Sequence, residues 1–226
     1  MKTFLDTEYV PGQADWIREH VIDGISAPAN YKDQAKIDAY IKGKADKAYR
    51  DSAFNSTFGE LVCISWAHGD GDVHSVSRQL AESEAALLEG FFNQIQDSFP
   101  TDPKFDSAEW GIDRHFEWVG FMILSDLRYI WRRAIINNVK IPFPIPVDAK
   151  PWDKNPLDIV NYWKCDRYDS ASASMNVLCK VFGIEGKEGF DGSMVYDAML
   201  AGEEKKVREY CEDDIRRTRA VYNRLF

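Results

Sequence analysis

Residues 210–225 read YCEDDIRRTRAVYNRL and end the chain with the pattern of an amphipathic helix, which we predict over 203–225. One broad face of that helix carries Val207, Tyr210, Cys211, Asp214, Ile215, Thr218, Val221, Tyr222 and Leu225. Tyr210 and Asp214 are four residues apart, so the phenol and the carboxylate lie one turn from each other. A tyrosine and an aspartate at this spacing are usually core packing beside a surface acid. The spacing alone therefore does not establish a site.

A pair of acids follows the first apolar run of the chain. Residues 3–6, TFLD, look like the end of a buried strand, and Pro11-Gly12 stops it. Asp6 and Glu8 are two residues apart, and the alternation of side chains along a strand points both carboxylates to one face, where they can share a cation. An isolated Asp-Thr-Glu is more often a surface turn. Its meaning depends on the other acids of the chain.

Between these two ends, predicted strands and helices alternate. In chain order they are strands at 60–67 and 73–77, a helix from Ser83 to before Pro100, a strand at 115–124, a helix from Asp126 to before Pro142, and helices at 157–163 and 172–182. Five prolines make 141–156 a loop, Gly183 is a predicted helix cap, and 186–192 is a predicted turn. This order predicts one α/β domain over 1–226, with a central mixed sheet flanked by helices and a helical insertion at about 12–58.

Composition narrows the class of protein. The chain has 226 residues, of which 45% are hydrophobic, and its amino terminus reaches an acid by position 6, so we expect neither a membrane span nor a signal peptide and place the chain in the cytoplasm. Its four cysteines form no CxxC pair, and we expect all of them to be reduced and buried. A net charge of −9 argues against a protein that coats nucleic acid, but not against a nuclease that needs clustered carboxylates.

The order of the acids resembles the DEDD exonuclease superfamily. In its tyrosine subgroup the three motifs are DxE, a central motif ending in FD, and YxxxD, which correspond here to Asp6/Glu8, Asp126 and Tyr210/Asp214. The chain is similar to the predicted 3′-5′ exonucleases related to the proofreading domain of family B DNA polymerases, many of them from phages and bacteria. Phrases such as APANYKDQAKIDAYI, SEAALLEGFF, WRRAIINN and FGIEGKEGFDGS extend the resemblance over nearly the whole chain. It implies a ribonuclease H-like fold.

The central motif departs from the family pattern. Phe121-Met122 stands where the family usually has His-Asn, Ser125 precedes Asp126, and the segment is one residue short. Asp126 remains the predicted acid because it follows a buried strand and begins a helix. Asp113 precedes that strand and Glu117 lies inside it, so both are weaker candidates.

The resemblance implies a phosphodiester hydrolase that uses two Mg²⁺ or Mn²⁺ ions, and hard cations of this kind prefer oxygen ligands. By the same resemblance Asp6 bridges both ions, Glu8 and Asp214 complete the water-activating site, and Asp126 serves the leaving-group ion. Tyr210, with an ordinary pKa of about 10, is a poor base at neutral pH, so we expect it to orient the attacking water.

We expect the substrate to be nucleic acid with a 3′ end, with single-stranded DNA favoured over RNA, and a DNA polymerase or the replication machinery to be a partner. The predicted contact residues are Tyr9, Lys42, Lys44, Lys47, Arg128 and Arg132, with Arg133 as a further candidate. Solvated helix faces are the alternative for these lysines and arginines. For the whole chain, the alternatives are a catalytically silent ribonuclease H-like module that binds nucleic acid or a polymerase, and an endonuclease or ribonuclease on the same fold.

Overall fold

A mixed sheet of five strands forms the centre of the molecule. The computed structural model describes residues 1–98, 116–150, 152–165, 170–171, 173–185 and 189–226, and orders the strands β3-β2-β1-β4-β5. The strands are β1 (Lys2–Pro11), β2 (Gly59–His68), β3 (Val73–Ser77), β4 (Glu117–Gly120) and β5 (Leu157–Asp158). β1 is antiparallel to β2 and parallel to β4, while β2 and β3, both predicted as strands, pair as an antiparallel hairpin. The predicted α/β class is confirmed.

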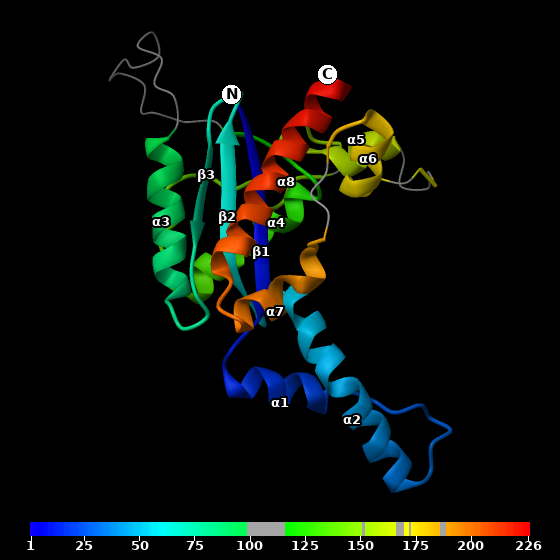
Figure 1. The fold of residues 1–226 in the computed structure, drawn as a ribbon. Coiled ribbons are helices and arrows are strands. Elements are labelled where there is room, and N and C mark those ends of the chain that lie inside the picture. Colours follow the sequence, from blue (N-terminus) through cyan, green and yellow to red (C-terminus); the bar gives the residue numbers. More distant parts are fainter. Residues whose placement is uncertain (99–115, 151, 166–169, 172, 186–188) are drawn as a thin grey trace.

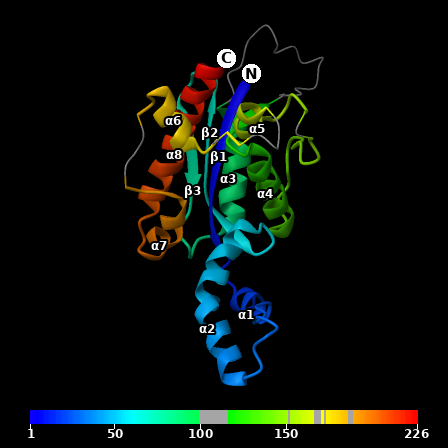
Figure 2. The ribbon, with the colours of Figure 1, turned by 90° about the vertical axis from the view of Figure 1, so that its right-hand side faces the viewer.

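Helices cover both faces of this sheet (Figures 1 and 2). One face packs against α6 (Met175–Phe182), α7 (Val195–Leu200) and α8 (Glu204–Leu225). The other packs against α3 (Glu84–Asp97) and α4 (Ile123–Ile136). As predicted, Ser83 caps α3 by accepting a hydrogen bond from the Ala86 amide, and Gly183 ends α6 in the left-handed conformation. No helix of the described residues is long and apolar enough to cross a membrane.

Side-chain alternation along β1 determines which residues face which helices. Phe4 packs with the residues under α8, whereas Leu5 packs with those under α3 and α4. Since neighbouring side chains point to opposite faces, Asp6 and Glu8 lie on the α8 side, and Thr7 lies on the α4 side. The central strand therefore sends its acids and its threonine in opposite directions.

The entry into α4 differs from the prediction. β4 ends at Gly120 and α4 begins at Ile123, so Asp126 lies in the first turn of the helix rather than at its start. The apolar run at 121–124 fits a strand and a helix equally well, and burial of Ile123, Leu127 and Ile130 along one helical face favours the helix. A side chain at Gly120 would meet the Leu5 carbonyl oxygen at 2.9 Å, so this turn packs directly on β1.

Met122 precedes α4 in a backbone conformation that methionine rarely adopts. Its φ is 54° and its ψ is 32°, in the left-handed region, and its side chain is 59% exposed. Asparagine tolerates this region better than other L-residues. We therefore expect Met122→Asn to raise the free energy of unfolding, measured by urea titration, by roughly 0.5–1 kcal/mol. Met122→Ala is the control, because it removes the same side chain without easing the backbone; an equal gain there would contradict the explanation.

The carboxy-terminal third contains two further departures. The predicted helix at 157–163 begins as β5 and continues as α5 (Ile159–Lys164), because β5 pairs with β4 at the sheet edge. The short elements η2 (Gly192–Met194) and α7 were not predicted.

Cys63, Cys179 and Cys211 are free and buried as predicted, but Cys165 is exposed, so that prediction was wrong for one thiol. His115 and part of the predicted turn at 186–192 lie outside the described residues.

Between β1 and β2 the chain forms α1 (Asp15–Asp23), α2 (Gln34–Asp51) and η1 (Ser52–Phe54). α1 and α2 project from the end of the sheet opposite the two termini (Figures 1 and 2). Within α2 only Tyr49 is fully buried, and its hydroxyl donates to the Gly12 carbonyl at 2.9 Å. The base of the projecting pair is therefore fixed to the end of β1. The division into one domain with an insertion stays a prediction.

Candidate active site

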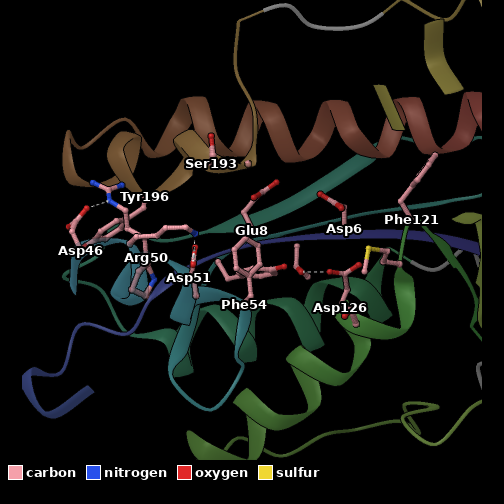
Figure 3. Close-up of a pocket in the computed structure, with 18 residues that line it drawn as sticks. Asp6, Glu8, Asp46, Arg50, Asp51, Phe54, Phe121, Asp126, Ser193 and Tyr196 are labelled. Carbon is pink, nitrogen blue, oxygen red and sulfur yellow. Dashed lines mark hydrogen bonds and ion pairs between the residues drawn. The ribbon is translucent and has the colours of Figure 1, made fainter. Parts of the chain in front are cut away.

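A cleft of about 560 Å³ opens between β1, the carboxyl end of α2, the start of α4, and η2 with α7. The residues that line it are Asp6, Thr7, Glu8, Tyr9, Pro11, Asp46, Lys47, Arg50, Asp51, Ala53, Phe54, Phe121, Met122, Ser125, Asp126, Gly192, Ser193 and Tyr196. Figure 3 shows Asp6 and Glu8 rising from β1 on the α8 side, while Asp126 reaches toward them from α4. Two of the three predicted acidic motifs thus meet in one cleft.

Asp6 and Glu8 are held in surroundings that resist their ionisation. Burial raises the pKa of both carboxyl groups well above the usual range. The neighbouring carboxylates Asp126 and Asp214 raise both values further, and Asp6 acts on Glu8 in the same direction. Carboxylates gathered in this way repel one another, and a bound cation would relieve that repulsion.

Asp126 reaches the cleft with the help of a threonine that the sequence analysis missed. The Thr7 hydroxyl donates to Asp126 Oδ1 at 2.7 Å, and both side chains are buried. Burial raises the pKa of Asp126 to about 8, although the Thr7 hydrogen bond lowers it. Since alternation sends Thr7 to the opposite face from Asp6 and Glu8, its position was readable from the sequence. Its partner was not, because that required the packing of α4.

Asp158 supports the turn at Phe121-Met122, the position where the family usually has His-Asn. Asp158 lies at the end of β5 and accepts a hydrogen bond from the Asn161 amide at 3.1 Å. Its carboxylate also accepts from the Met122 backbone, and these backbone bonds lower its pKa, while burial, the larger effect, raises it. Asp158 thereby ties the turn before α4 to the neighbouring strand. The shortened central motif retains a hydrogen-bonded support for the turn that precedes Asp126.

Tyr210 and Asp214 lie on α8, which covers the face of β1 that carries Asp6 and Glu8. Asp214 is buried, and burial raises its pKa to about 6, although Arg217, whose Nη1 donates to its Oδ1 at 3.3 Å, lowers the value. The side chains of Tyr210 and Asp214 lie close enough to shift each other's pKa. Burial, then the charges of Asp214 and Glu8, raise the Tyr210 pKa, so the phenol keeps its proton at neutral pH. Neither residue lines the cleft itself.

The donor chemistry of this group fits hard divalent cations. Asp6, Glu8, Asp126 and Asp214 offer carboxylate oxygens, and the charges of Asp126 and Asp214 raise the pKa values of Asp6 and Glu8. In the described part of the chain, the two cations that line the cleft are already paired with other acids: Lys47 with Asp51, and Arg50 with Asp46 and Asp197. Oxygen ligands with uncompensated charge are what Mg²⁺ and Mn²⁺ prefer.

Of the nucleic-acid contacts predicted on β1 and α2, only Tyr9 and Lys47 line this cleft. Tyr9 lines it, but one face of its ring is stacked on Tyr129, with centroids 4.5 Å apart and planes at 8°. Lys47 lines it and is paired with Asp51 at 2.5 Å. Lys42 and Lys44 are exposed on α2 and do not line the cleft.

The predicted arginine contacts on α4 serve other partners. Arg128 donates to the Val147 carbonyl at 2.7 Å, and Arg132 donates to the Ser56 hydroxyl at 3.2 Å. Neither of them lines the cleft. Arg133 is buried in an ion pair with Glu84 at 2.6 Å, so its proposed contact with nucleic acid is wrong.

One exposed aromatic residue of the cleft was missed by the sequence analysis. Phe54 belongs to η1, is 73% exposed, and meets the Tyr9 ring edge-on with centroids 5.9 Å apart. An aromatic face left open to solvent beside a group of acids can stack on a base. No local signal identified Phe54, since a phenylalanine usually enters the core.

Comparison with known proteins agrees with this geometry. A family model described as "Predicted 3'-5' exonuclease related to the exonuclease domain of PolB" matches residues 53–226. The family B DNA polymerase from the hyperthermophilic archaeon Pyrobaculum calidifontis shares the fold, with a TM-score of 0.61 and 14% identity. That match covers 99% of this chain and 24% of the polymerase chain, and the fold is ribonuclease H-like. No curated protein matches this chain. The chain belongs to the family of predicted 3′-5′ exonucleases related to the exonuclease domain of PolB.

Proposed function

We propose that this chain is an active exonuclease that depends on two divalent cations, Mg²⁺ or Mn²⁺, and releases mononucleotides from the 3′ end of DNA. The observation that carries the proposal is the meeting of Asp6, Glu8 and Asp126 in one cleft, with Asp214 close enough to raise the pKa of Asp6 and Glu8. Acids brought together from β1, α4 and α8 carry an electrostatic cost that folding alone does not require.

Asp6, Glu8, Asp126 and Asp214 would hold the cations. Once bound, the cations supply a hydroxide at neutral pH and neutralise charge on the phosphate. The Thr7 hydroxyl keeps Asp126 aimed into the cleft, through a hydrogen bond of 2.7 Å. Tyr210 holds its proton and can donate a hydrogen bond to the attacking water or to the scissile phosphate.

We expect Tyr210→Phe to lower the turnover number by roughly one to three decades, because the ring stays and only the positioned hydroxyl is lost. Tyr222→Phe is the matched control, since Tyr222 lies on the same helix and packs against Phe4 with centroids 5.4 Å apart. Single-turnover rates on an end-labelled strand measure both variants. Full activity of Tyr210→Phe at saturating metal would remove Tyr210 from the mechanism.

Phe54 is the best-placed group to bind the base of the terminal nucleotide, since it is exposed within the cleft. Stacking on an aromatic ring contributes about 1–3 kcal/mol per base, so Phe54→Ala should weaken binding of single-stranded DNA by roughly tenfold or more. Trp152→Ala is the control, because Trp152 is 79% exposed and does not line the cleft. Fluorescence anisotropy with a labelled strand measures both; equal losses would contradict a specific role for Phe54.

A time course on 5′-labelled single-stranded DNA, with Mg²⁺ or Mn²⁺ and with excess chelator, tests the proposed activity. Stepwise shortening from the 3′ end that stops in chelator is the expected result. Internal cuts would favour an endonuclease on the same fold. Binding without cleavage would favour the catalytically silent module. A matched RNA strand tests the preference for DNA, and a DNA polymerase stays the proposed partner.

A further inference from the structure

Cys211 places a thiol against the central carboxylate of the site. It lies on α8, three residues before Asp214, and is fully buried. Its Sγ lies 3.4 Å from Asp6 Oδ2 and 3.6 Å from the Asp6 carbonyl oxygen, and its one proton can be donated to either. The contact with the backbone oxygen would suit any buried thiol. The contact with Oδ2 brings sulfur to an atom that the proposed function assigns to a cation.

The same thiol completes a group with metal-binding separations. One ligand atom each from Asp6, Glu8 and Cys211 lie within 4.8 Å of one another, and in the described part of the chain no other group of three or more His, Cys, Asp or Glu residues does so. That separation is about twice a zinc–sulfur bond of ~2.3 Å, so one ion can reach all three atoms. The group combines two oxygen donors and one sulfur donor, drawn from β1 and α8.

We propose that Cys211 determines which cations this site accepts, by offering sulfur as a third ligand to thiophilic ions such as Zn²⁺ and Cd²⁺. This inference rests on the proposed function, because it uses the same Asp6 and Glu8. Mg²⁺ binds the oxygen atoms and leaves the thiol protonated, whereas a thiophilic ion displaces the thiol proton into solvent and forms a metal–sulfur bond. Zn²⁺ and Cd²⁺ then compete with Mg²⁺ for the site.

Two other cysteines affect the design of the test: Cys63 is the matched control, and Cys165 is replaced in every variant. Cys63, on β2, is also fully buried; it adjoins Cys211, and its Sγ lies 3.8 Å from Ser65 Oγ. It does not belong to the group formed with Asp6 and Glu8. Cys165 is exposed and would bind Cd²⁺ from solution by itself, so the experiment uses the full chain with Cys165→Ser.

The test is titration of this metal-free chain with Cd²⁺, followed by the ultraviolet sulfur-to-cadmium charge-transfer band. We expect one equivalent of Cd²⁺ to produce the band. Cys211→Ser and Cys211→Ala should abolish it, Cys63→Ser should keep it, and Asp6→Asn should weaken Cd²⁺ binding by at least about tenfold, the range seen for groups that support a metal ligand. Absence of the band in the Cys165→Ser chain, or its survival in the Cys211 variants, would overturn the proposal.

A crystal of the Cys165→Ser chain soaked in Cd²⁺ decides the matter even if the Cys211 variants do not fold. A cadmium peak bonded to Cys211 Sγ and a carboxylate of Asp6 or Glu8 supports the proposal, and a peak elsewhere overturns it. Failure of the proposed function would be seen in a different measurement, the Mg²⁺-dependent cleavage of DNA. A chain with the cadmium–sulfur band but no Mg²⁺-dependent cleavage is not the proposed exonuclease, whereas cleavage without the band refutes the role of Cys211 alone.

Discussion

Asp6→Asn should lower the 3′-5′ exonuclease turnover number by at least about three decades, the largest loss expected for any single substitution in this chain. Asp6 lies between the other acids: Asp126 and Asp214 both raise its pKa, and it in turn raises that of Glu8. Asparagine keeps the shape of the side chain but removes the charge that the proposed cations would need. Single-turnover rates at saturating Mg²⁺ measure the loss.

The same substitution should make the metal-free protein more stable at neutral and higher pH. Burial and neighbouring acids raise the pKa values of Asp126 to about 8 and of Asp214 to about 6. A carboxyl group whose pKa is higher in the folded state stabilises the fold fully below its unfolded pKa, and that contribution is lost as pH rises through the folded value. Metal-free wild-type protein should therefore lose stability between about pH 4 and pH 8.

Melting temperatures in chelator at pH 5 and pH 8.5 test this linkage. The fall in Tm between the two should be smaller in Asp6→Asn than in the wild type, because one of the repelling charges is absent. Asp38→Asn is the control, since Asp38 is exposed on α2 and lies outside the cleft. An active Asp6→Asn variant, or one less stable than wild type at pH 8.5, would contradict the assignment of Asp6.

Arg133→Met should reduce the free energy of unfolding by about 3–5 kcal/mol, because it leaves a buried carboxylate without its partner. Arg133 and Glu84 form an ion pair with a 2.6 Å contact, and their side chains are 8% and 5% exposed. Glu84 also accepts from the Leu61 amide and from Asn137 Nδ2, each at 2.7 Å. The pair therefore joins the start of α3 to α4 and β2.

Urea denaturation measures this loss, and two further variants identify its cause. Arg132→Met changes the neighbouring exposed arginine and should alter stability by less than about 0.5 kcal/mol. Glu84→Leu combined with Arg133→Met removes both charges and should recover part of the loss, because apolar replacement of a buried pair is often close to neutral. If Arg133→Met cost no more than Arg132→Met, the pair would not fix α4, and the position of Asp126 would need another explanation.

The cleft is lined by more carboxyl groups than cations, and divalent cations bound there would offset the carboxylates, so the proposed enzyme could act on nucleic acid despite its acidic composition. Lys47 forms an ion pair with Asp51, and Arg50 forms ion pairs with Asp46 and Asp197. A polyanionic strand is therefore attracted only after divalent cations have offset the carboxylates. This separates the proposed enzyme from proteins that coat DNA through lysine and arginine, which the net charge of −9 already disfavoured.

The sequence by itself determined the class of fold and the candidate acids. The alternation of β1 placed Asp6 and Glu8 on one face, and the 3.6-residue period of α8 placed Tyr210 above Asp214. Both follow from backbone geometry within one element, which a local pattern records. The resemblance to the exonuclease family then supplied Asp126 as the acid to expect beside them.

Only the tertiary structure decided where α4 begins and which cations face the cleft. The Thr7–Asp126 hydrogen bond joins residues 119 apart, and the Arg133–Glu84 contact joins residues 49 apart. An arginine in a sequence shows its charge but not its partner, so Arg133 could be read as a DNA contact until Glu84 was found beside it. Cys211 illustrates the same limit, since its proximity to Asp6 spans 205 residues. Contacts of this kind depend on how separate elements pack, and no local pattern in the sequence records that packing.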